Sequence, residues 1–493
     1  MTEKKQNIKS NKNEYWFVLV VLVYLFAISC KDNNSGIVDP KNEGKKIVIL
    51  YTNDEHGWME PTSTTGGAAG MVGLWHEKEG YTKDGAYLIL SGGDQWTGPA
   101  ISTWYQGDSM AEVMNQMNYT AAAIGNHEFD FKIEELQKRV EQLNFPLLSA
   151  NIREKSTGKI PDFATPYIIK EVDGVVIGII GLTTTTTPLT TFPTHVIDYD
   201  FIPYSTALNE IVPKVKSEGT ELLIVIGHIC ENEMEALVPL ANELGISVIG
   251  GGHCHALVNK LVNGVALIEG GSFMQNYGKV EIWFDDENNK VNNLIPTVHN
   301  NIGGSPDAQI ATIVAKWKTK ISSSLSEVIG YTNKEIDRHS TEMYNMITDS
   351  WLITFPDANV SLTNTGGIRQ SIPAGEITLE TIVGVLPFAN SIVKLELTGD
   401  ELIGGIRNLV VGGMTTVGGY KLSDGTSIKN NLTYNVLTTD YLYARPDFSF
   451  QNDDPSPNQT SVHYRQPTID WIRSLNTSAS NPINNYLDFT ARR

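Results

Sequence analysis

The stretch "AAAIGNHEFDFK", residues 121–132, runs from an apolar segment through one glycine into a group of polar and charged side chains. Apolar runs without in–out alternation are typical of strands that are covered on both faces. The turn after such a strand is usually built from Gly, Pro, Ser or a single Asx residue. Here the strand is followed by Asn126, His127, Glu128 and Asp130. This composition indicates a functional loop at the end of a buried strand.

The same apolar pattern recurs across the first 300 residues. The runs are 47–51, 86–90, 175–182, 222–227 and 246–251, and the segments 109–118 and 132–144 between them have helical spacing. Strands that alternate with helices in this way predict a layered α/β domain. At 493 residues the chain is also too long for one compact core, so we expect a second domain.

Polar side chains follow these strands at the point where each strand ends. Asp54 and His56 follow the first run, Asp94 the second, His228 a later one, and His253 and His255 the next. The carboxyl ends of strands in open α/β sheets meet at one crevice, where ligands bind. Asp, Asn and His supply the oxygen and nitrogen donors that divalent transition metals take. One such residue is usually an ordinary turn residue, but five loops together predict a metal site.

The order of these motifs, D-x-H, GD, GNH[DE], GH and GHxH, resembles that of the calcineurin-like metallophosphoesterases. Four longer stretches resemble the 5′-nucleotidase and UDP-sugar hydrolase family more narrowly: "YTNDEHG", "SGGDQWTG", "EVMNQMNYTAAAIGNHEFD" and "LLSANI". The resemblance implies a metal-dependent phosphoric ester hydrolase with a catalytic α/β metallophosphoesterase domain at 46–300. A linker helix at 301–330 would join it to a smaller α/β substrate-binding domain at 331–493.

The resemblance also implies a role for each residue of the site. Asp94 would bridge two divalent ions (Mn, Zn, Co or Fe), of which one binds Asp54, His56 and His255 and the other Asn126, His228 and His253. Two cations roughly 4 Å apart neutralise phosphoryl oxygens and activate a shared water. His127 would stabilise the transition state or protonate the leaving oxygen, and Asp130 would orient it. The ordinary alternatives are a packed ring for His127 and a helix cap for Asp130. The complete GNHEFD string favours catalysis.

The loop after Asp130 departs from the family. Relatives usually have glycine at the position of Lys132, so we expect a differently shaped loop here.

Three segments of the second half resemble the family's nucleotide clamp: "NTGGIR" (364–369), "VLPFAN" (385–390) and "DYLYARPD" (440–447). By this match the substrate-binding residues are Asn364, Arg369, Phe388, Tyr441 and Asp447, with a looser match at Arg338. The alternatives are a core position for Phe388 and a solvated side chain for Arg369. Arg445 and Pro446 replace the family's two glycines before Asp447, and the polar tail after residue 450 is expected to be loop.

The N-terminus predicts export. Four lysines precede the apolar run 16–29, which is short for a membrane span and suited to a signal peptide at 1–29. "AISC" resembles a lipobox, so Cys30 would carry a lipid that holds the protein on a membrane, and 30–45 would be a tether. We therefore expect a periplasmic or cell-surface lipoprotein of a Gram-negative bacterium. Cys230 and Cys254 could pair in an oxidising compartment, although two small buried residues is the favoured interpretation.

The expected substrate is a nucleoside 5′-monophosphate or related nucleotide. UDP-sugars, 2′,3′-cyclic nucleotides and other phosphomonoesters are alternatives. A nucleotide-binding lipoprotein without turnover is an alternative of another class. The net charge of −19, from 56 acidic and 37 basic residues, argues against a nucleic acid polymer as partner.

Overall fold

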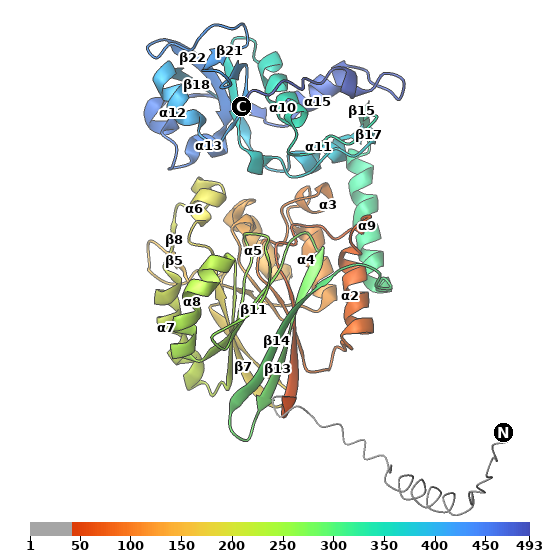
Figure 1. Ribbon diagram of the computed structural model, residues 1–493, viewed down its shortest axis with the longest axis vertical. Helices are drawn as coiled ribbons and strands as arrows, with labels where there is room; N and C mark the ends of the chain where they lie inside the picture. The colour runs from red at the N-terminus through yellow and green to blue at the C-terminus, as the bar shows by residue number, and fades with distance from the viewer. Residues whose placement is uncertain (1–41) are drawn as a thin grey trace, which may run out of the picture. The chain divides into compact units, whose positions relative to one another are not determined.

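The computed structural model describes residues 42–493 (Figure 1). The predicted signal peptide, Cys30 and most of the tether therefore lie outside the described residues. Among residues 42–493, none of the helices combines the length and the apolar character that a membrane span requires. Residues Gly44–Arg493 form one compact unit.

The first half of this unit contains two six-stranded sheets. In order across the first sheet, the strands are β14 (Lys290–Asn300), β13 (Asn276–Asp285), β1 (Lys45–Thr52), β2 (Tyr87–Ser91), β3 (Ala121–Ala123) and β4 (Leu147–Leu148). The second sheet has the order β11 (Leu257–Val262), β12 (Val265–Gly270), β10 (Ile246–Gly250), β9 (Leu222–Gly227), β7 (Val175–Leu182) and β6 (Tyr167–Val172). The predicted apolar runs are thus confirmed as strands, and they divide between two sheets.

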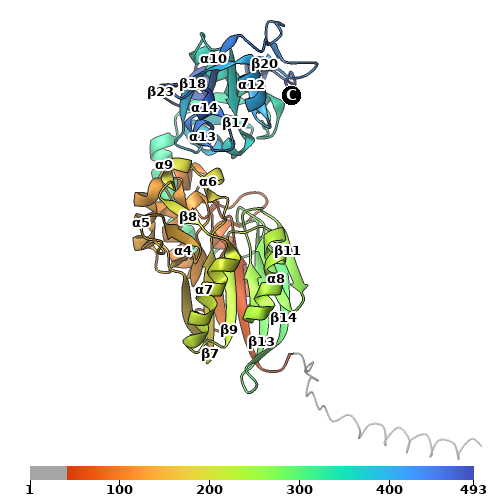
Figure 2. The same cartoon turned by 90° about the vertical axis from the view of Figure 1, so that its left-hand side faces the viewer.

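Buried apolar residues on both faces of each sheet explain why these strands lack an in–out alternation. Ile49 and Leu88 of the first sheet meet Ile177 and Ile224 of the second in a core between the sheets. Helices cover the outer face of the first sheet: α2 (Gly67–Lys78), α4 (Asp108–Met117), α5 (Lys132–Gln142) and α9 (Ala308–Leu325). The outer face of the second sheet is covered by α7 (Tyr204–Ser217) and α8 (Glu231–Leu244) (Figure 2). The layer order is helix, sheet, sheet, helix.

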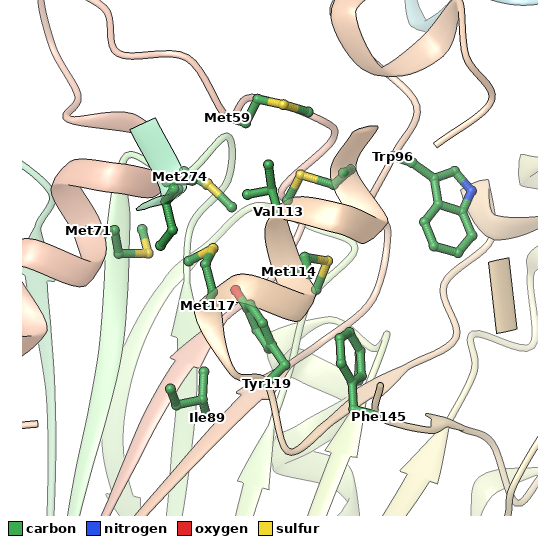
Figure 3. Packing of buried hydrophobic residues seen from close by; sticks show 14 of the residues in the cluster. Met59, Met71, Ile89, Trp96, Val113, Met114, Met117, Tyr119, Phe145 and Met274 are labelled. Atoms are coloured by element: carbon green, nitrogen blue, oxygen red, sulfur yellow. The ribbon is translucent and has the colours of Figure 1, made fainter. Parts of the chain in front are cut away.

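Methionines fill much of the space between α2, α4 and the first sheet. Met71, Met114, Met117 and Met274 are buried there together (Figure 3). Unbranched side chains of this kind fit irregular gaps between elements. Tyr119 of the same cluster reaches from the core to the hydroxyl of Thr52 at the end of β1, 2.6 Å away. The core therefore supports the loop that leaves β1.

The strand directions bring the polar loops together. β1, β2, β3 and β4 are parallel neighbours, and β7, β9, β10 and β12 are parallel neighbours in the other sheet. All the loops that carry predicted metal ligands leave the carboxyl ends of β1, β2, β3, β9 and β10. The two sheets together thus supply the site.

The second half contains a five-stranded sheet with helices on both faces. Its order is β19 (Val410–Gly412), β16 (Val360–Thr363), β22 (Thr433–Thr439), β18 (Ser391–Thr398) and β23 (Asn458–His463). One face packs on α10 (Thr341–Thr354), α11 (Leu379–Val385) and α15 (Gln466–Ser474), and the other on α12 (Gly399–Ile406), α13 (Asp440–Ala444) and α14 (Phe450–Asp453). Smaller two-stranded pairings in this half join β15 (Val328–Thr332) to β17 (Gly375–Thr378) and β20 (Met414–Thr415) to β21 (Lys421–Leu422). In the first half, β5 (Ile152–Glu154) pairs with β8 (Tyr199–Phe201).

The chain passes between the two halves through α9. Asp307 caps this helix by accepting hydrogen bonds from the backbone N–H groups of Gln309 and Ile310. Its buried side chains belong to the core of the first half. A helix is therefore present where the sequence predicted one, and it is rooted in the first sheet's layer.

The expectation of a loop-like tail was wrong. β23 pairs with β18, and α15 buries Ile469 and Ile472 against the second domain's core. The apolar positions are few and separated by Asn, Asp, Pro and Ser, so the composition hid a short strand and an amphipathic helix.

Candidate active site

The predicted metal ligands form two clusters at the carboxyl ends of the parallel strands. Donor atoms lie within 4.8 Å of one another in the groups Asp54, His56, His255 and Asp94, His228, His253. The first group is one of the two sets that the resemblance implied, and the second contains His228 and His253 of the other set together with the predicted bridging residue Asp94. Asp54 and Asp94 are 0% and 2% exposed, so their carboxylates face the clusters and not bulk water.

Asp94 lies between the two clusters. Its Oδ2 is 3.0 Å from Nε2 of His228 and 3.8 Å from Nε2 of His56, residues that belong to different clusters. The backbone N–H of His127 donates to Oδ1, 2.8 Å away, which orients the carboxylate. One oxygen that faces both clusters is the arrangement that a bridging ligand requires.

Backbone carbonyls set the tautomers of two ligand histidines. Nδ1 of His56 lies 2.9 Å from the carbonyl oxygen of Thr97, and Nδ1 of His228 lies 2.9 Å from that of Gly92. A carbonyl only accepts, so each Nδ1 carries a proton and Nε2 is the nitrogen directed at the cluster. Both rings therefore present Nε2 as the atom that would bind a metal.

Two buried oxygens in the clusters fit a metal. Oδ1 of Asp54 and Oδ1 of Asn126 have no hydrogen-bond partner among the described residues. The amide nitrogen of Asn126 donates to the carbonyl oxygen of Thr190, which turns its oxygen inward. A buried oxygen without a hydrogen-bond partner raises the free energy of the folded state unless a bound cation coordinates it. The residues present therefore fit a pair of divalent ions.

The pKa values of His228 and His253 reflect the negative charge of the neighbouring carboxylates and the burial of the clusters. Burial lowers the pKa of His228, but the carboxylates of Asp94 and Asp54 outweigh burial and raise it to about 10. Burial and the neighbouring His228 lower the pKa of His253 to about 4. The carboxylates of Asp94 and Asp54 thus favour a positive charge in this space, which bound divalent ions would supply.

The ligand loops have an unusual backbone. Residues with left-handed φ angles include Asp54 (48°), His56 (46°), Asp94 (61°), His253 (74°) and His255 (56°). Non-glycine residues adopt this region rarely and at a cost of about 1–2 kcal/mol each. Conformations of this kind persist where the surrounding structure imposes them, and they gather at functional sites.

His127 lies beside the clusters, and Asp130 fixes the orientation of its ring. Its Nδ1 is 2.7 Å from Oδ2 of Asp130, and the other oxygen of Asp130 accepts from the hydroxyl of Thr191 at 2.9 Å. Burial lowers the pKa of His127, but Asp130 and Asp94 outweigh burial and raise it. Nε2 of His127 therefore faces Asp94, 4.0 Å from its Oδ2, with a proton available.

Glu128 supports the loops. Its buried carboxylate accepts hydrogen bonds from the backbone N–H groups of Asp94, Gln95 and Gly125. It therefore ties the loop after β2 to the loop after β3, and so holds Asp94 near Asn126. Lys132 takes φ = 71°, the backbone that a glycine adopts readily, so the lysine at this position keeps a glycine-like turn.

A cavity of about 1530 Å³ joins the clusters to the second domain. Asn364, Arg369, Phe388 and Tyr441 line it together with His56 and His127. The Phe388 ring stacks on the His127 ring with centroids 5.8 Å apart, and a guanidinium nitrogen of Arg369 lies 3.2 Å from Nε2 of His56. Four of the predicted substrate-binding residues thus lie on the same cavity as the metal clusters.

The other two predicted substrate residues lie elsewhere. Both carboxylate oxygens of Asp447 accept from Arg445, at 2.8 and 2.7 Å, and Asp447 is not among the cavity-lining residues. Arg445 lines the cavity instead. Arg338 donates to the backbone carbonyl of Arg369 and so supports that residue from behind.

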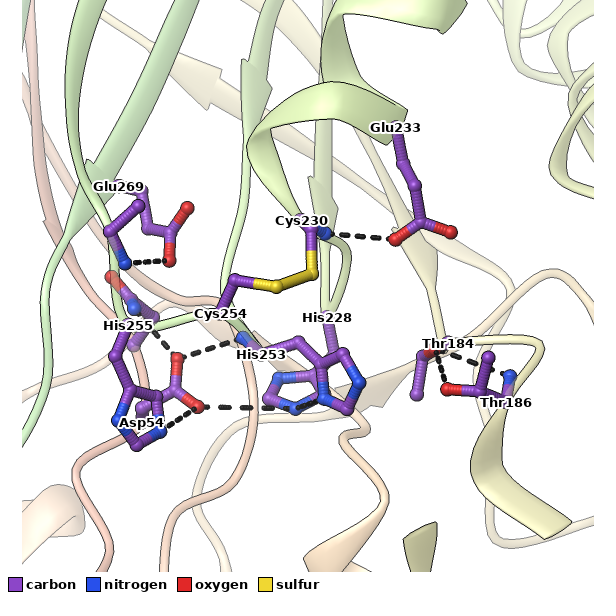
Figure 4. Close-up of a disulfide and its surroundings, with 12 residues drawn as sticks. Asp54, Thr184, Thr186, His228, Cys230, Glu233, His253, Cys254, His255 and Glu269 are labelled. Atoms are coloured by element: carbon purple, nitrogen blue, oxygen red, sulfur yellow. Dashed lines mark hydrogen bonds and ion pairs between the residues drawn. A yellow bond between two sulfur atoms is a disulfide. The ribbon is translucent and has the colours of Figure 1, made fainter. Parts of the chain in front are cut away.

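The two cysteines of the described residues form a disulfide, Cys230–Cys254, with Cα atoms 5.2 Å apart (Figure 4). The expectation of two small buried residues was wrong, because Cys254 is exposed and Cys230 is half-buried. The cysteines follow β9 and β10, which are neighbours in the second sheet. Sequence alone does not reveal that neighbourhood.

Sequence reasoning missed Thr191, Thr190 and Arg445. The first two lie beyond the threonine run 183–187, where repeated small polar residues offered no individual signal. Arg445 was noted only as a departure from the family.

Comparisons with known proteins agree with this geometry. The family model for calcineurin-like phosphoesterases matches residues 47–257, and that for the 5′-nucleotidase C-terminal domain matches residues 323–416. A cell wall protein of Listeria monocytogenes is 24% identical, over 81% of this chain and 63% of its own length. The 5′-nucleotidase of Vibrio cholerae is 29% identical, over 84% of this chain and 86% of its own.

The fold recurs in a solved structure. The 5′-nucleotidase precursor of Thermus thermophilus superposes with a TM-score of 0.78 at 21% identity, over 91% of this chain and 99% of that one. The fold and the two-cluster ligand set define a metallophosphoesterase, the class of metal-dependent phosphoester hydrolases. With its second domain, the chain belongs to the 5′-nucleotidase family within that class.

Proposed function

We propose that this protein releases phosphate from nucleoside 5′-monophosphates. The observation that carries the proposal is the shared cavity, which is lined by His127 and residues of both metal clusters from the first domain and by Phe388 and Tyr441 from the second. A phosphate ester placed at the clusters would extend its leaving group toward two aromatic rings. A flat nucleobase suits such rings because stacking is favourable and tolerant of base identity.

The residues would divide the work as follows. Two divalent ions, held by the two clusters with Asp94 between them, would neutralise the phosphoryl oxygens and acidify a water. Arg369 would bind a phosphoryl oxygen with its guanidinium, which already points at His56. His127 would give its Nε2 proton to the leaving oxygen, and Asp130 would keep the Nδ1 proton in place.

The test is phosphate release by the Mn²⁺-loaded chain from AMP, UDP-glucose, 2′,3′-cyclic AMP and an aryl phosphate. We expect AMP to be preferred over the aryl ester. Phe388→Ala should raise KM for AMP about tenfold, because one stacked base contributes about 1–3 kcal/mol, and leave the aryl ester unaffected.

Phe489→Ala is the matched control, because Phe489 is exposed and outside the cavity. Equal rates of phosphate release from all four esters would be consistent with the metal site but would contradict nucleobase binding by Phe388 and Tyr441. Tight AMP binding without any phosphate release would favour a nucleotide-binding lipoprotein.

A second candidate substrate class follows from the size of the cavity. Small-molecule sites usually have about 300–1,000 Å³, and this one has about 1530 Å³. A nucleoside diphosphate linked to a sugar would fill more of it than AMP does. The UDP-glucose arm of the panel decides between the two, because a higher kcat/KM for that ester would make it the preferred substrate.

The site of action is proposed from the N-terminal sequence. We infer that the protein is exported and anchored by a lipid on Cys30, in the periplasm or on the surface of a Gram-negative cell. Support comes from the apolar run 16–29 and from relatives whose names describe a cell wall protein and a precursor. Labelling with a radioactive fatty acid should mark the wild-type chain and not Cys30→Ala. Equal labelling of both would reject the anchor.

A further inference from the structure

The disulfide joins the two loops of the second sheet that carry metal ligands. Cys230 lies two residues after His228, in the loop after β9, and Cys254 lies between His253 and His255, after β10 (Figure 4). His253 and His228 belong to one cluster, and His255 belongs to the other. The single covalent bond therefore adjoins ligands of both clusters.

The loop that carries Cys254 is under strain. His253 and His255, on either side of the cysteine, both have left-handed backbone angles of 74° and 56°. Hydrogen bonds also hold this loop. The N–H of Gly252 donates to the carbonyl oxygen of Ile229, and the N–H of Gly271 donates to that of Ala256. The His253 N–H donates to Oδ2 of Asp54, and the N–H of Ala256 donates to Oε1 of Glu269. The first of these partners is itself a metal ligand. Among the described residues, the disulfide is the covalent cross-link that joins this loop to the loop after β9.

The bond is also open to reductants. Cys254 is exposed, whereas Cys230 is half-buried at the N-terminal cap of α8, a helix of 14 residues. An attacking thiolate would reach the sulfur of Cys254 first and release the sulfur of Cys230. The positive end of the α8 dipole favours that leaving thiolate.

We propose that the Cys230–Cys254 disulfide positions His253 and His255 for metal binding, so that its reduction weakens the binding of divalent ions. Reduction is a two-electron step. The S–S bond breaks, each sulfur gains a proton, and a dithiol reductant is converted to its own disulfide. Once released, the loop relaxes from the left-handed conformation, and both clusters lose a correctly placed imidazole. This inference does not depend on which ester the enzyme hydrolyses.

The experiment uses the full chain with Cys30→Ala in every sample, so that Cys230 and Cys254 are the only cysteines. One sample is reduced with a dithiol, which is then removed under nitrogen because thiols bind metals. A second carries Cys230→Ser and Cys254→Ser. For each, Mn²⁺ affinity is measured by titration and Mn²⁺ loss is timed in excess chelator.

We expect affinity to fall about tenfold in both the reduced and the double-serine proteins, as for other residues that orient metal ligands. The double variant should not respond to the dithiol, and reoxidation of the reduced sample should restore affinity. The metal-free proteins are then compared by thermal unfolding. Lower thermal stability with unchanged Mn²⁺ affinity would overturn the proposal, because the bond would then be a general cross-link. Two free thiols in the protein before reduction, detected by alkylation and mass spectrometry, would overturn it as well.

Discussion

At the scale of single residues, the candidate metal site is built from side chains whose backbone is held in a rare conformation. Asp54, His56, Asp94, His253 and His255 all have positive φ. Glycine would adopt these φ angles without strain, but the chain has a predicted metal ligand at each of these positions. The strained backbone therefore coincides with the predicted metal ligands. Strain of this kind is expected where a residue is kept for its function and not for stability.

His127 is expected to act on the leaving group and not on the metals. His127→Ala should lower kcat for AMP by roughly 100-fold or more, as general acid catalysis contributes about 10²–10⁴-fold. Metal content should stay unchanged, because the ring of His127 belongs to neither cluster. Steady-state kinetics and elemental analysis of the same samples check this. Loss of bound metal together with activity would contradict the assignment.

Asp94 and His255 should differ in how many ions their loss removes. Oδ2 of Asp94 faces both clusters, whereas His255 belongs to one. We therefore expect Asp94→Ala to bind neither ion firmly and His255→Ala to retain one. Elemental analysis after exhaustive dialysis gives the ratio of metal to protein. An Asp94→Ala protein that keeps both ions would show that this carboxylate is not the bridge.

Site residues could be predicted from the sequence where a short local motif marks them, and not where they depend on contacts between distant segments. The seven predicted ligands and His127 could be picked out from short motifs because each lies within a few residues of the end of one of five strands. The disulfide and the Arg445–Asp447 pair depend on which loops become neighbours or which side chain turns inward. No local pattern carries that information, so these features had to come from the structure.

At the scale of elements, loops are tied to one another by buried acceptors. Glu128 connects the ends of β2 and β3 through three backbone N–H groups. Removal of the Glu128 side chain would leave these buried N–H groups without hydrogen-bond partners. The apolar strand pattern predicted the strands themselves, whereas the tail after residue 450 shows that short elements with few apolar residues escape such patterns.

Glu128→Ala should therefore lower the free energy of unfolding by about 3 kcal/mol, since unsatisfied buried groups cost about 1–3 kcal/mol each and the loops relax in part. Glu141→Ala, an exposed glutamate of α5, is the matched control and should change little. Urea unfolding measures both. Equal effects of the two substitutions would reject the role of Glu128 as a tie between loops.

The start of α13 predicts a pH effect on stability. Burial raises the pKa of Asp440 to about 6, above an unfolded value of about 3.9. A raised carboxyl pKa means that ionisation disfavours the folded state, so this cost is absent below about pH 4 and complete above about pH 6. Asp440→Asn should raise Tm by about 2 °C at pH 8, after allowance for partial exposure, and by nothing at pH 4. Thermal unfolding at both pH values checks this, and an equal gain at both would reject the cause.

At the scale of the whole molecule, the two domains are in direct contact. The hydroxyl of Tyr441 donates to the carbonyl of Leu189, and Lys318 of α9 forms ion pairs with Glu60 of the first domain and Glu380 of the second. The two-domain α/β organisation was predictable from strand patterns and family resemblance. The division of the first domain into two sheets was not, because strands buried on both faces look alike in either arrangement.

The central claim is that phosphate release from AMP requires the two metal clusters. The most direct measurement compares the full chain before and after removal of metal with a chelator, with metal content and phosphate release determined on the same samples. We predict two divalent ions per chain in the loaded protein, no release above background in the stripped protein, and recovery on addition of Mn²⁺. Release that continues at the same rate after the metal is gone would contradict the account.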